Sequence, residues 1–248
     1  MTILGVVSGA GGVGCSTLTA ALGVRAAAGG WRVVVVDGDP LSGGLQVTLA
    51  AEHLPGHRWA HLVEVDGEVA GDRLLTRLPA VGGCSLLSGG RASADLEAVV
   101  PEPVPAEAFD AVIAALERES DLLVIDWGRT ARPGWGATLL LVPITPRGLA
   151  DTHVWLGRFG ADGLAGIVTR GGKSDRRVAE SVAAGFDLPL LGHLTPDRRV
   201  TAAERAGEPP AYRRGGSVRA LADGLVASAL AATPPQTHAS RAAAESRR

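Results

Sequence analysis

The chain lacks several features that would place it in common functional classes. Lys173 is the single lysine among 24 basic residues, and aromatic residues make up only 4% of the 248 residues. The formal net charge of −2 leaves no global basic field, which argues against a protein held on nucleic acid by charge alone. Two cysteines, Cys15 and Cys84, are too few for a disulfide framework and suit a reducing cytoplasm.

Long hydrophobic runs are missing as well. The longest, around residues 139–142, fall far short of the roughly 20 residues that a membrane helix needs. The N-terminus enters an apolar, strand-like run at once and lacks the positive segment of a signal peptide. We therefore expect a cytoplasmic protein without a transmembrane segment. At 46% hydrophobic residues, the chain can bury one large α/β core.

A glycine-rich loop is the most informative feature that is present. An apolar run at 3–8 leads into G-A-G-G-V-G-C-S-T at 9–17, and a helical pattern continues to residue 28. Such a strand, loop and helix form an anion cradle, because glycines let backbone N–H groups turn toward a phosphate and the helix dipole favours negative charge. Ser16 and Thr17 stand where hydroxyl groups meet a magnesium ion and an α-phosphate. A packing turn without a ligand is the alternative.

The loop departs from the usual pattern at its cations. The pattern G-x-x-x-x-G-K-[ST] has lysine where this chain has Cys15, and a deviant form has a second lysine where this chain has Ala10. Each lost cation would contribute about 4 kcal/mol against one phosphate charge at 4 Å and moderate screening. A charge on the transferring phosphoryl group is worth about 10³ to 10⁵ in rate. We expect nucleotide binding through amides and hydroxyls to be weak or absent, and hydrolysis to be very slow or absent.

Cys15 itself allows two interpretations. A thiol at a helix N-terminus has a lowered pKa, which would suit a redox switch. The alternative, which we favour, is a small residue that fills the loop.

Carboxylates follow two further apolar runs. Four consecutive valines at 33–36 are typical of a parallel strand buried on both faces, and Asp37-Gly38-Asp39 follows them. A second run at 121–125 ends in Asp126, as a Walker B element does. Parallel strands present their carboxyl ends at the ligand-binding edge of an open α/β sheet. We predict that Asp39 positions the attacking water in any hydrolysis, and that Asp37 and Asp126 hold magnesium through water. An ordinary Asp-Gly turn and a helix-capping aspartate are the alternatives.

The remaining chain alternates strand and helix patterns, which predicts a single-domain, doubly wound, mainly parallel α/β sheet with helices on both faces. We expect this domain to span 1–232 and a disordered tail to span 233–248. The expected strands are 84–87, 138–144, 164–169 and 188–191, and the expected helices are 69–78, 106–118, 149–159, 175–184, 202–206 and 217–230.

These motifs, in this order, resemble the ParA/MinD superfamily, a group of SIMIBI-type P-loop ATPases with the deviant P-loop NTPase fold. More narrowly, they resemble the CpaE/TadZ branch and the actinobacterial septum-site-determining, CpaE-like proteins. The segment G-H-R-W-A-H-L at 56–62 is similar to a Gly-x-Arg-Trp segment of that actinobacterial group. The motifs that carry the resemblance are the loop at 9–17, V-V-V-V-D-G-D-P at 33–40, the strand and aspartate at 121–126, L-L-L-V-P-I-T-P at 139–146, L-G-H-L-T-P-D-R-R-V at 191–200 and G-E-P-P at 207–210.

The resemblance assigns roles residue by residue. Asp39 matches the switch I aspartate that positions water, and Asp126 matches the switch II aspartate. The turn at 195–197 matches the loop that lies against the adenine, and Thr169 falls where many relatives have a base-contacting asparagine. The full nucleotide-binding set is Gly11, Gly12, Val13, Gly14, Cys15, Ser16, Thr17, Thr169, Thr195, Pro196 and Asp197. The magnesium set is Ser16, Asp37 and Asp126.

The resemblance implies a localisation and assembly scaffold for a Tad/Flp-type pilus or secretion system, or for septum-site placement. Such a scaffold would bind ATP and Mg²⁺ weakly or not at all, form a homodimer, and reach a cell pole, septum or membrane through its protein partners. An active ATPase of the chromosome- or plasmid-partitioning type is the alternative, with Arg129, Arg132 or Arg147 replacing the lysines. A DNA-bound partition protein is disfavoured by the near-neutral charge.

Overall fold

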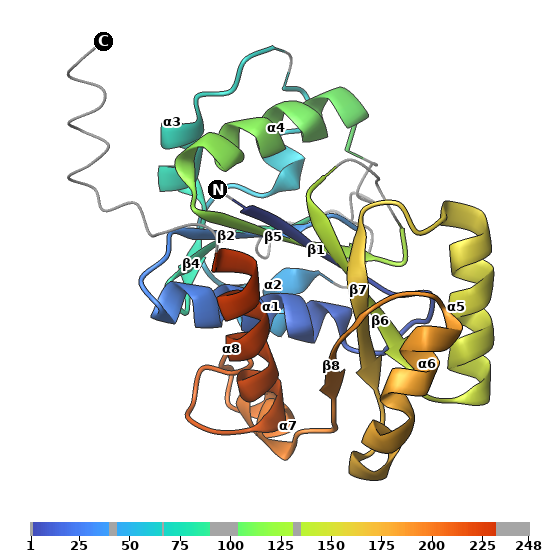
Figure 1. Cartoon of the computed structure of the whole chain (residues 1–248). Helices are drawn as coiled ribbons and strands as arrows, with labels where there is room; N and C mark the ends of the chain where they lie inside the picture. The colour runs from blue at the N-terminus through green and yellow to red at the C-terminus, as the bar shows by residue number, and fades with distance from the viewer. Residues whose placement is uncertain (1, 40–43, 66, 90–103, 131–134, 232–248) are drawn as a thin grey trace, which may run out of the picture.

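The molecule is built on one eight-stranded sheet, shown in Figure 1. The structure, a computed structural model, describes residues 2–39, 44–65, 67–89, 104–130 and 135–231. The strands follow the order β3-β4-β2-β5-β1-β6-β7-β8. Of the described strand pairs, only β3–β4 is antiparallel. The strands are β1 (Thr2–Val7), β2 (Val33–Asp37), β3 (Ala80–Val81), β4 (Cys84–Leu87), β5 (Leu122–Gly128), β6 (Ala137–Pro143), β7 (Leu164–Arg170) and β8 (Leu190–Leu194).

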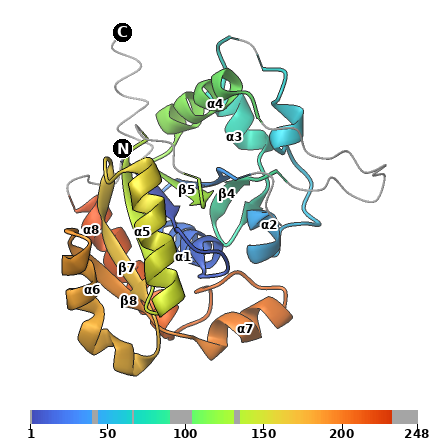
Figure 2. The same ribbon diagram turned by 90° about the vertical axis from the view of Figure 1, so that its right-hand side faces the viewer.

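Helices cover both faces of this sheet, as the two views in Figures 1 and 2 show. One apolar layer joins the sheet to α1 and α8, and the other joins it to α4, α5 and α6. The expected α/β fold class, doubly wound and mainly parallel, is therefore confirmed. The helices are α1 (Cys15–Ala28), α2 (Leu45–Thr48), α3 (Gly71–Arg77), α4 (Ala106–Glu119), α5 (Pro146–Phe159), α6 (Ala179–Gly185), α7 (Arg198–Arg205) and α8 (Ser217–Leu230), with short 3₁₀ helices η1 (Trp59–His61) and η2 (Lys173–Val178).

The order of the strands places a crevice at one edge of the sheet. After β1 the chain crosses to β2 on one side of β1, and β6, β7 and β8 later extend the sheet on the opposite side of β1. In open α/β sheets, ligands bind beyond the carboxyl ends of the strands where the order reverses in this way. The loop between β1 and α1 lies at this position.

Several boundaries differ from the expectations. β5 continues through Asp126 to Gly128, because Asp126 pairs with both β1 and β2 and Gly128 pairs with Val7 of β1. β8 begins at Leu190 and runs through His193, so a segment expected as a loop is partly strand. The helix expected at 175–184 is divided into η2 and α6. The tail expected at 233–248 lies outside the described residues. No helix in the described ranges is long and apolar enough to cross a membrane.

Candidate functional site

Ser8 anchors the glycine loop to both neighbours of β1. Its hydroxyl donates to the carbonyl of Leu141 in β6 at 2.7 Å, and its backbone N–H donates to the carbonyl of Gly128 in β5 at 2.9 Å. The Ala10 N–H then donates back to the Ser8 hydroxyl at 3.2 Å. Ser8 is fully buried, so the start of the loop is held by buried hydrogen bonds to two strands.

The loop then turns into α1 through left-handed glycines. Gly12 has φ +69° and Gly14 has φ +99°, conformations that residues with a Cβ rarely adopt. α1 begins at Cys15 directly after Gly14, and no side chain caps its N-terminus. The backbone N–H groups of its first turn therefore remain available to an anion.

A cavity of about 320 Å³ opens over this loop. Its volume lies at the lower end of the range for small-molecule sites. All seven predicted phosphate-loop residues, Gly11 to Thr17, belong to its wall. The other wall residues are Ala10, Asp39, Gly128 and Arg129. The structure thus brings Asp39 to the phosphate loop, 22 residues or more away in sequence from any residue of that loop.

Asp126 lies beside the loop and is coupled to Ser16. The Ser16 hydroxyl hydrogen-bonds to the Asp126 carboxylate, and the Gly128 N–H donates to Asp126 Oδ1 at 3.0 Å. Burial raises the pKa of Asp126, these two hydrogen bonds oppose the shift, and the charge of Asp39 adds to it. A hydroxyl and a carboxylate held together are hard oxygen donors of the kind that Mg²⁺ takes alongside water and phosphate oxygens. Ser16 and Asp126 therefore fit a magnesium ion brought in with a nucleotide.

The position of the Asp39 carboxylate requires glycine at residue 128. A methyl group on Gly128 would lie 2.8 Å from Asp39 Oδ2, and Gly128 has φ +57°. A side chain at position 128 would therefore displace the Asp39 carboxylate. The Trp155 indole of α5 donates to the carbonyl of Arg129 at 3.0 Å and fixes the next residue of the same turn.

Asp37, predicted with the magnesium set, makes structural hydrogen bonds. Its Oδ2 accepts from the Leu45 N–H and the Ser88 hydroxyl at 2.9 Å each, and its Oδ1 accepts from the Asp39 N–H at 3.3 Å. Burial raises its pKa to about 7, and the charge of Asp126 adds to the shift. Asp37 is not among the described residues of the cavity wall. A contact between Asp37 and magnesium stays a prediction. In the structure, the Asp37 carboxylate stabilises the turn that contains Asp39.

The lowered thiol pKa that a redox switch at Cys15 would need is not found. Its thiol is buried, and burial raises its pKa well above the usual value. The charge of Asp126 raises the pKa further, and Arg170 only partly opposes these effects. The neutral thiol favours the second interpretation, a small side chain that fills the loop and packs in the core.

The expected base-side residues lie at the ends of β7 and β8. The Nε2 atom of His193 lies 3.0 Å from the carbonyl of Gly172, which can only accept, so Nε2 carries the proton. Nδ1 lies 2.9 Å from the buried Thr169 hydroxyl, which also lies 3.3 Å from the carbonyl of Gly192. The turn Thr195-Pro196-Asp197 is tied to α8, since the Asp197 carboxylate accepts from the Val218 N–H and the Ser217 hydroxyl. Contact of these residues with a base stays a prediction.

Among the arginines proposed to replace lysine, only Arg129 lies in the cavity wall. Arg147 is exposed and pairs with Asp151 along α5 at 3.7 Å, and Arg132 lies outside the described residues. The sequence reasoning missed Arg170, whose Nη1 lies 2.8 Å from the position of a methyl group on Gly14. The available signal was its place at the end of an apolar strand, the same signal that identified Asp126.

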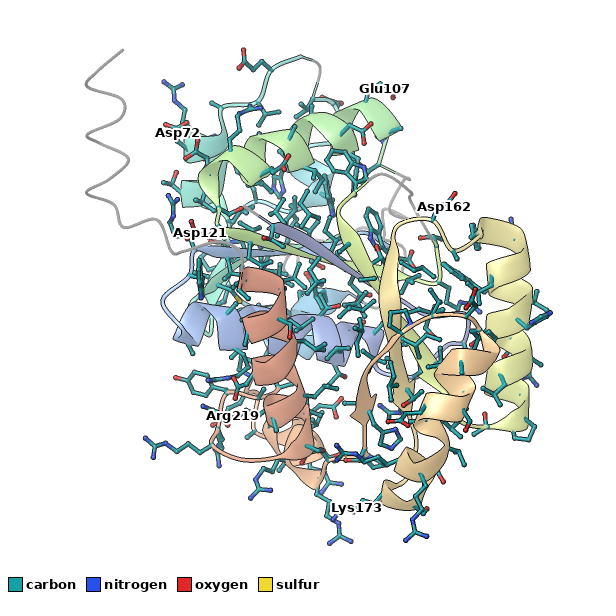
Figure 3. All side chains as sticks on the ribbon, in the orientation of Figure 1. Asp72, Glu107, Asp121, Asp162, Lys173 and Arg219 are labelled. Atoms are coloured by element: carbon teal, nitrogen blue, oxygen red, sulfur yellow. The ribbon has the colours of Figure 1, made fainter. Side chains whose placement is uncertain are left out.

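The other possible cation, Lys173, is exposed in η2 at the lower end of the view in Figure 3. Across the described part of the chain, no three His, Cys, Asp or Glu side chains gather into a metal-binding group. A magnesium ion here would thus depend on Ser16, Asp126 and oxygens from the nucleotide and water.

A parallel strand, a left-handed glycine loop, an open helix N-terminus and strand-end carboxylates together define a nucleotide-binding α/β domain of the P-loop type. The chain belongs to the CobQ/CobB/MinD/ParA nucleotide binding domain family, whose model matches residues 4–210. This places the chain in the ParA/MinD superfamily expected from its motifs.

Two curated proteins match most of this chain. The chain is 31% identical over 206 residues to the uncharacterized protein Rv3660c of Mycobacterium tuberculosis strain H37Rv, and the match covers 80% of this chain. The same identity holds for the uncharacterized protein MT3760 of strain CDC 1551. The chain spans about half of the length of these relatives, 55% in each case.

Solved structures show the same fold at low sequence identity. The MinC:MinD cell division protein complex of Aquifex aeolicus matches with a TM-score of 0.72 and 16% identity, over 96% of this chain and 99% of that one. The septum site-determining protein MinD of Pyrococcus horikoshii, complexed with Mg-ADP, matches with a TM-score of 0.60 and 21% identity, over 92% and 95%. An ATP complex of a Cyanothece McdA variant matches with a TM-score of 0.61 and 19% identity, over 96% and 99%.

Proposed function

We propose that this chain is a nucleotide-responsive localisation and assembly scaffold of the CpaE/TadZ or septum-site-determining type. It binds ATP or ADP with Mg²⁺ weakly and hydrolyses ATP very slowly or not at all. It acts in a pilus or secretion system or in septum placement, at a pole or septum that it reaches through protein partners. Residues 1–232 act as one ParA/MinD-like unit that forms a homodimer through the phosphate-loop face.

One observation carries this proposal. Ala10 and Cys15 occupy both lysine positions of the deviant loop, and both belong to the wall of the phosphate cavity. The acidic parts of such a site are kept, because Asp39 faces the same cavity and Ser16 is paired with Asp126. A site with its magnesium ligands but without its loop cations favours retention of a nucleotide over phosphoryl transfer.

Relatives support the choice of process. One MinD neighbour is a cell division protein in complex with MinC, and another is a septum site-determining protein. Their low identity supports a shared fold, and the process is our proposal for this chain.

A partition-type ATPase is the second candidate, favoured by one observation. Arg129 lines the cavity and Arg170 lies against Gly14, so positive charge is present near the loop without lysine. If either guanidinium stabilised the transition state, hydrolysis would survive the loss of both lysines.

Phosphate release under steady-state conditions separates the two candidates. With ATP and Mg²⁺, we expect no release above the protein-free background, whereas calorimetry detects binding of ADP that tightens with Mg²⁺. Asp39→Ala should leave ADP binding largely intact, with the exposed Asp162→Ala as matched control. Robust turnover that Asp39→Ala abolishes and Asp162→Ala preserves would establish the ATPase instead. The absence of any ADP binding would refute the nucleotide part of the proposal.

A further inference from the structure

Arg170 ends β7 at the same edge of the sheet as the phosphate loop. Its backbone is held from both sides, because its carbonyl accepts from the Ile144 N–H at 2.7 Å and the next residue, Gly171, donates to the carbonyl of Leu194 at 3.1 Å. A side chain that leaves a strand held in this way starts from a rigid position. Its direction is therefore set by the sheet and not by a mobile loop.

The guanidinium of Arg170 lies directly against the loop. Nη1 is 2.8 Å from the position that a methyl group on Gly14 would occupy, so a Cβ at residue 14 would push the guanidinium away from its present place. Leu194 Cδ2 lies 3.8 Å from the same position and closes the other side. Gly14 is the residue before α1 begins, so the charge lies at the helix N-terminus. The positive charge of Arg170 also opposes the rise in the pKa of the Cys15 thiol.

Among the described residues, Arg170 has no ion-pair partner. The structure shows neither an ion pair nor a hydrogen bond from the Arg170 guanidinium to any described residue, although the side chain is half-buried. Arg213 and Arg25, by contrast, pair with Glu208 and Asp223. A half-buried arginine without a partner, next to a loop that has lost its lysines, is suited to a bound anion.

We infer that Arg170 is the cation of the phosphate site, supplied from β7 in place of the lysines missing at Ala10 and Cys15. The inference rests on the proposed function, since it names a further residue of the same nucleotide site. Arg170 contributes to the affinity for the phosphate groups of the nucleotide, and the nucleoside part is held by other contacts. The positive charge of Arg170 comes from β7, beside the loop and not from within it. It therefore stabilises bound nucleotide but does not restore fast phosphoryl transfer.

Calorimetry on three variants tests this inference with ADP and adenosine as probes. Arg170→Gln should weaken binding of ADP about 10- to 100-fold, the value of one charged hydrogen bond, and leave adenosine binding unchanged. Arg170→Lys should retain part of the affinity, since it keeps the charge but loses the planar fork. The matched control Arg177→Gln removes an exposed arginine of η2 and should change neither affinity.

The salt dependence of ADP affinity is a second measurement, and it would not change if Arg170 acted only through packing. The affinity of the wild-type chain for ADP should fall with rising NaCl, and the slope should be smaller in Arg170→Gln. If Arg170→Gln fails to fold by circular dichroism, Arg170→Met keeps the apolar stem of the side chain and should show the same loss.

The outcomes separate this inference from the proposed function. ADP binding to Arg170→Gln or Arg170→Met within twofold of the wild type would overturn the role of Arg170 and leave the proposed function standing. An equal loss of ADP and adenosine would also overturn it, because Arg170 would then shape the site without reading phosphate. A wild-type chain that binds no ADP would refute both.

Discussion

The two halves of the ligand-binding edge of the sheet, an acidic half that also carries Arg129 and a basic half at β7, are built differently. On the side of β2 and β5, Asp37 and Asp126 accept hydrogen bonds from the protein itself. On the side of β7, Arg170 lies against the loop with no partner among the described residues. The phosphate loop lies between them. The acidic half is thus a fixed frame, whereas the basic half keeps its charge available for an anion.

Packing beneath the two halves differs as well. Under the acidic half, Trp59 stacks on Phe109 with ring centroids 5.2 Å apart, and Phe109 contacts Trp127 at 5.7 Å. The Trp59 indole also donates to the carbonyl of Asp37 at 2.8 Å. β8, beyond β7, is an edge strand, and Leu191 on it is exposed. Three of the nine aromatic residues therefore pack together next to the Asp37–Asp39 turn.

Restoring the lysines would return positive charge to the loop itself. The double variant Ala10→Lys/Cys15→Lys should raise steady-state phosphate release by about 10³-fold or more, because loop cations stabilise the transferring phosphoryl group. Release is measured with ATP and Mg²⁺ at a single protein concentration.

The control for this variant is the same double substitution combined with Asp39→Ala, which should return release to background. A folded double variant that is no faster than the wild type would show that the lost lysines do not limit hydrolysis.

Removing Trp59 would test whether the aromatic cluster supports the acidic half. Trp59→Ala should lower the free energy of unfolding by about 3–5 kcal/mol, since it leaves a cavity beside Phe109 and Trp127. Trp59→Phe keeps the stacking and loses the hydrogen bond to the Asp37 carbonyl, which should cost about 1 kcal/mol. Both are measured by urea unfolding.

Val154→Ala, at an exposed position of α5, is the control and should lie within about 0.5 kcal/mol of the wild type. A loss in Trp59→Ala no larger than in this control would contradict the supporting role of the cluster.

The pH dependence of stability would sharpen the description of the acidic half. The pKa of Asp37 rises from 3.8 to about 7 on folding, so the folded chain holds a proton that the unfolded chain has lost between these values. Stability from this group is present below pH 4 and is lost as pH rises to 7. From pH 5 to 8 the free energy of unfolding should fall by about 2 kcal/mol.

Thermal unfolding of Asp37→Asn should show a smaller fall over this range, because the amide cannot ionise. A part of the fall should remain, since burial also raises the pKa of Asp126. The exposed Asp72→Asn is the control and should follow the wild type. An unchanged slope in Asp37→Asn would exclude Asp37 as its source.

Local pattern was sufficient for much of the fold. The apolar run, glycine loop and helix at 3–28 predict β1 and α1 to within one residue, because glycine and β-branched residues act through backbone preferences. The predicted helix at 217–230 coincides with α8. β3, a two-residue strand, was missed because only its antiparallel pairing with β4 defines it.

Site residues were predictable where a polar or glycine-rich motif directly follows a predicted strand. Asp39 and the loop residues 11–17 share one cavity, as motif and topology together indicate. Asp37 follows the same pattern, yet its carboxylate binds Leu45 and Ser88, which are 8 and 51 residues away. Such partners are chosen by the packing of α2 and β4 against β2, and no local pattern identifies them.

By itself, the sequence determined the doubly wound α/β class, the glycine-rich loop after the first strand and the absence of lysine from that loop, since these follow from residue identity and spacing. Tertiary structure alone decided which charges face that loop. In the folded chain, the Asp37 carboxylate accepts hydrogen bonds from the protein, and Arg147 pairs with Asp151. The guanidinium of Arg170 lies against Gly14. The physical reason is that charges act over a few ångströms of space, and the sheet sets those distances between residues more than 150 positions apart.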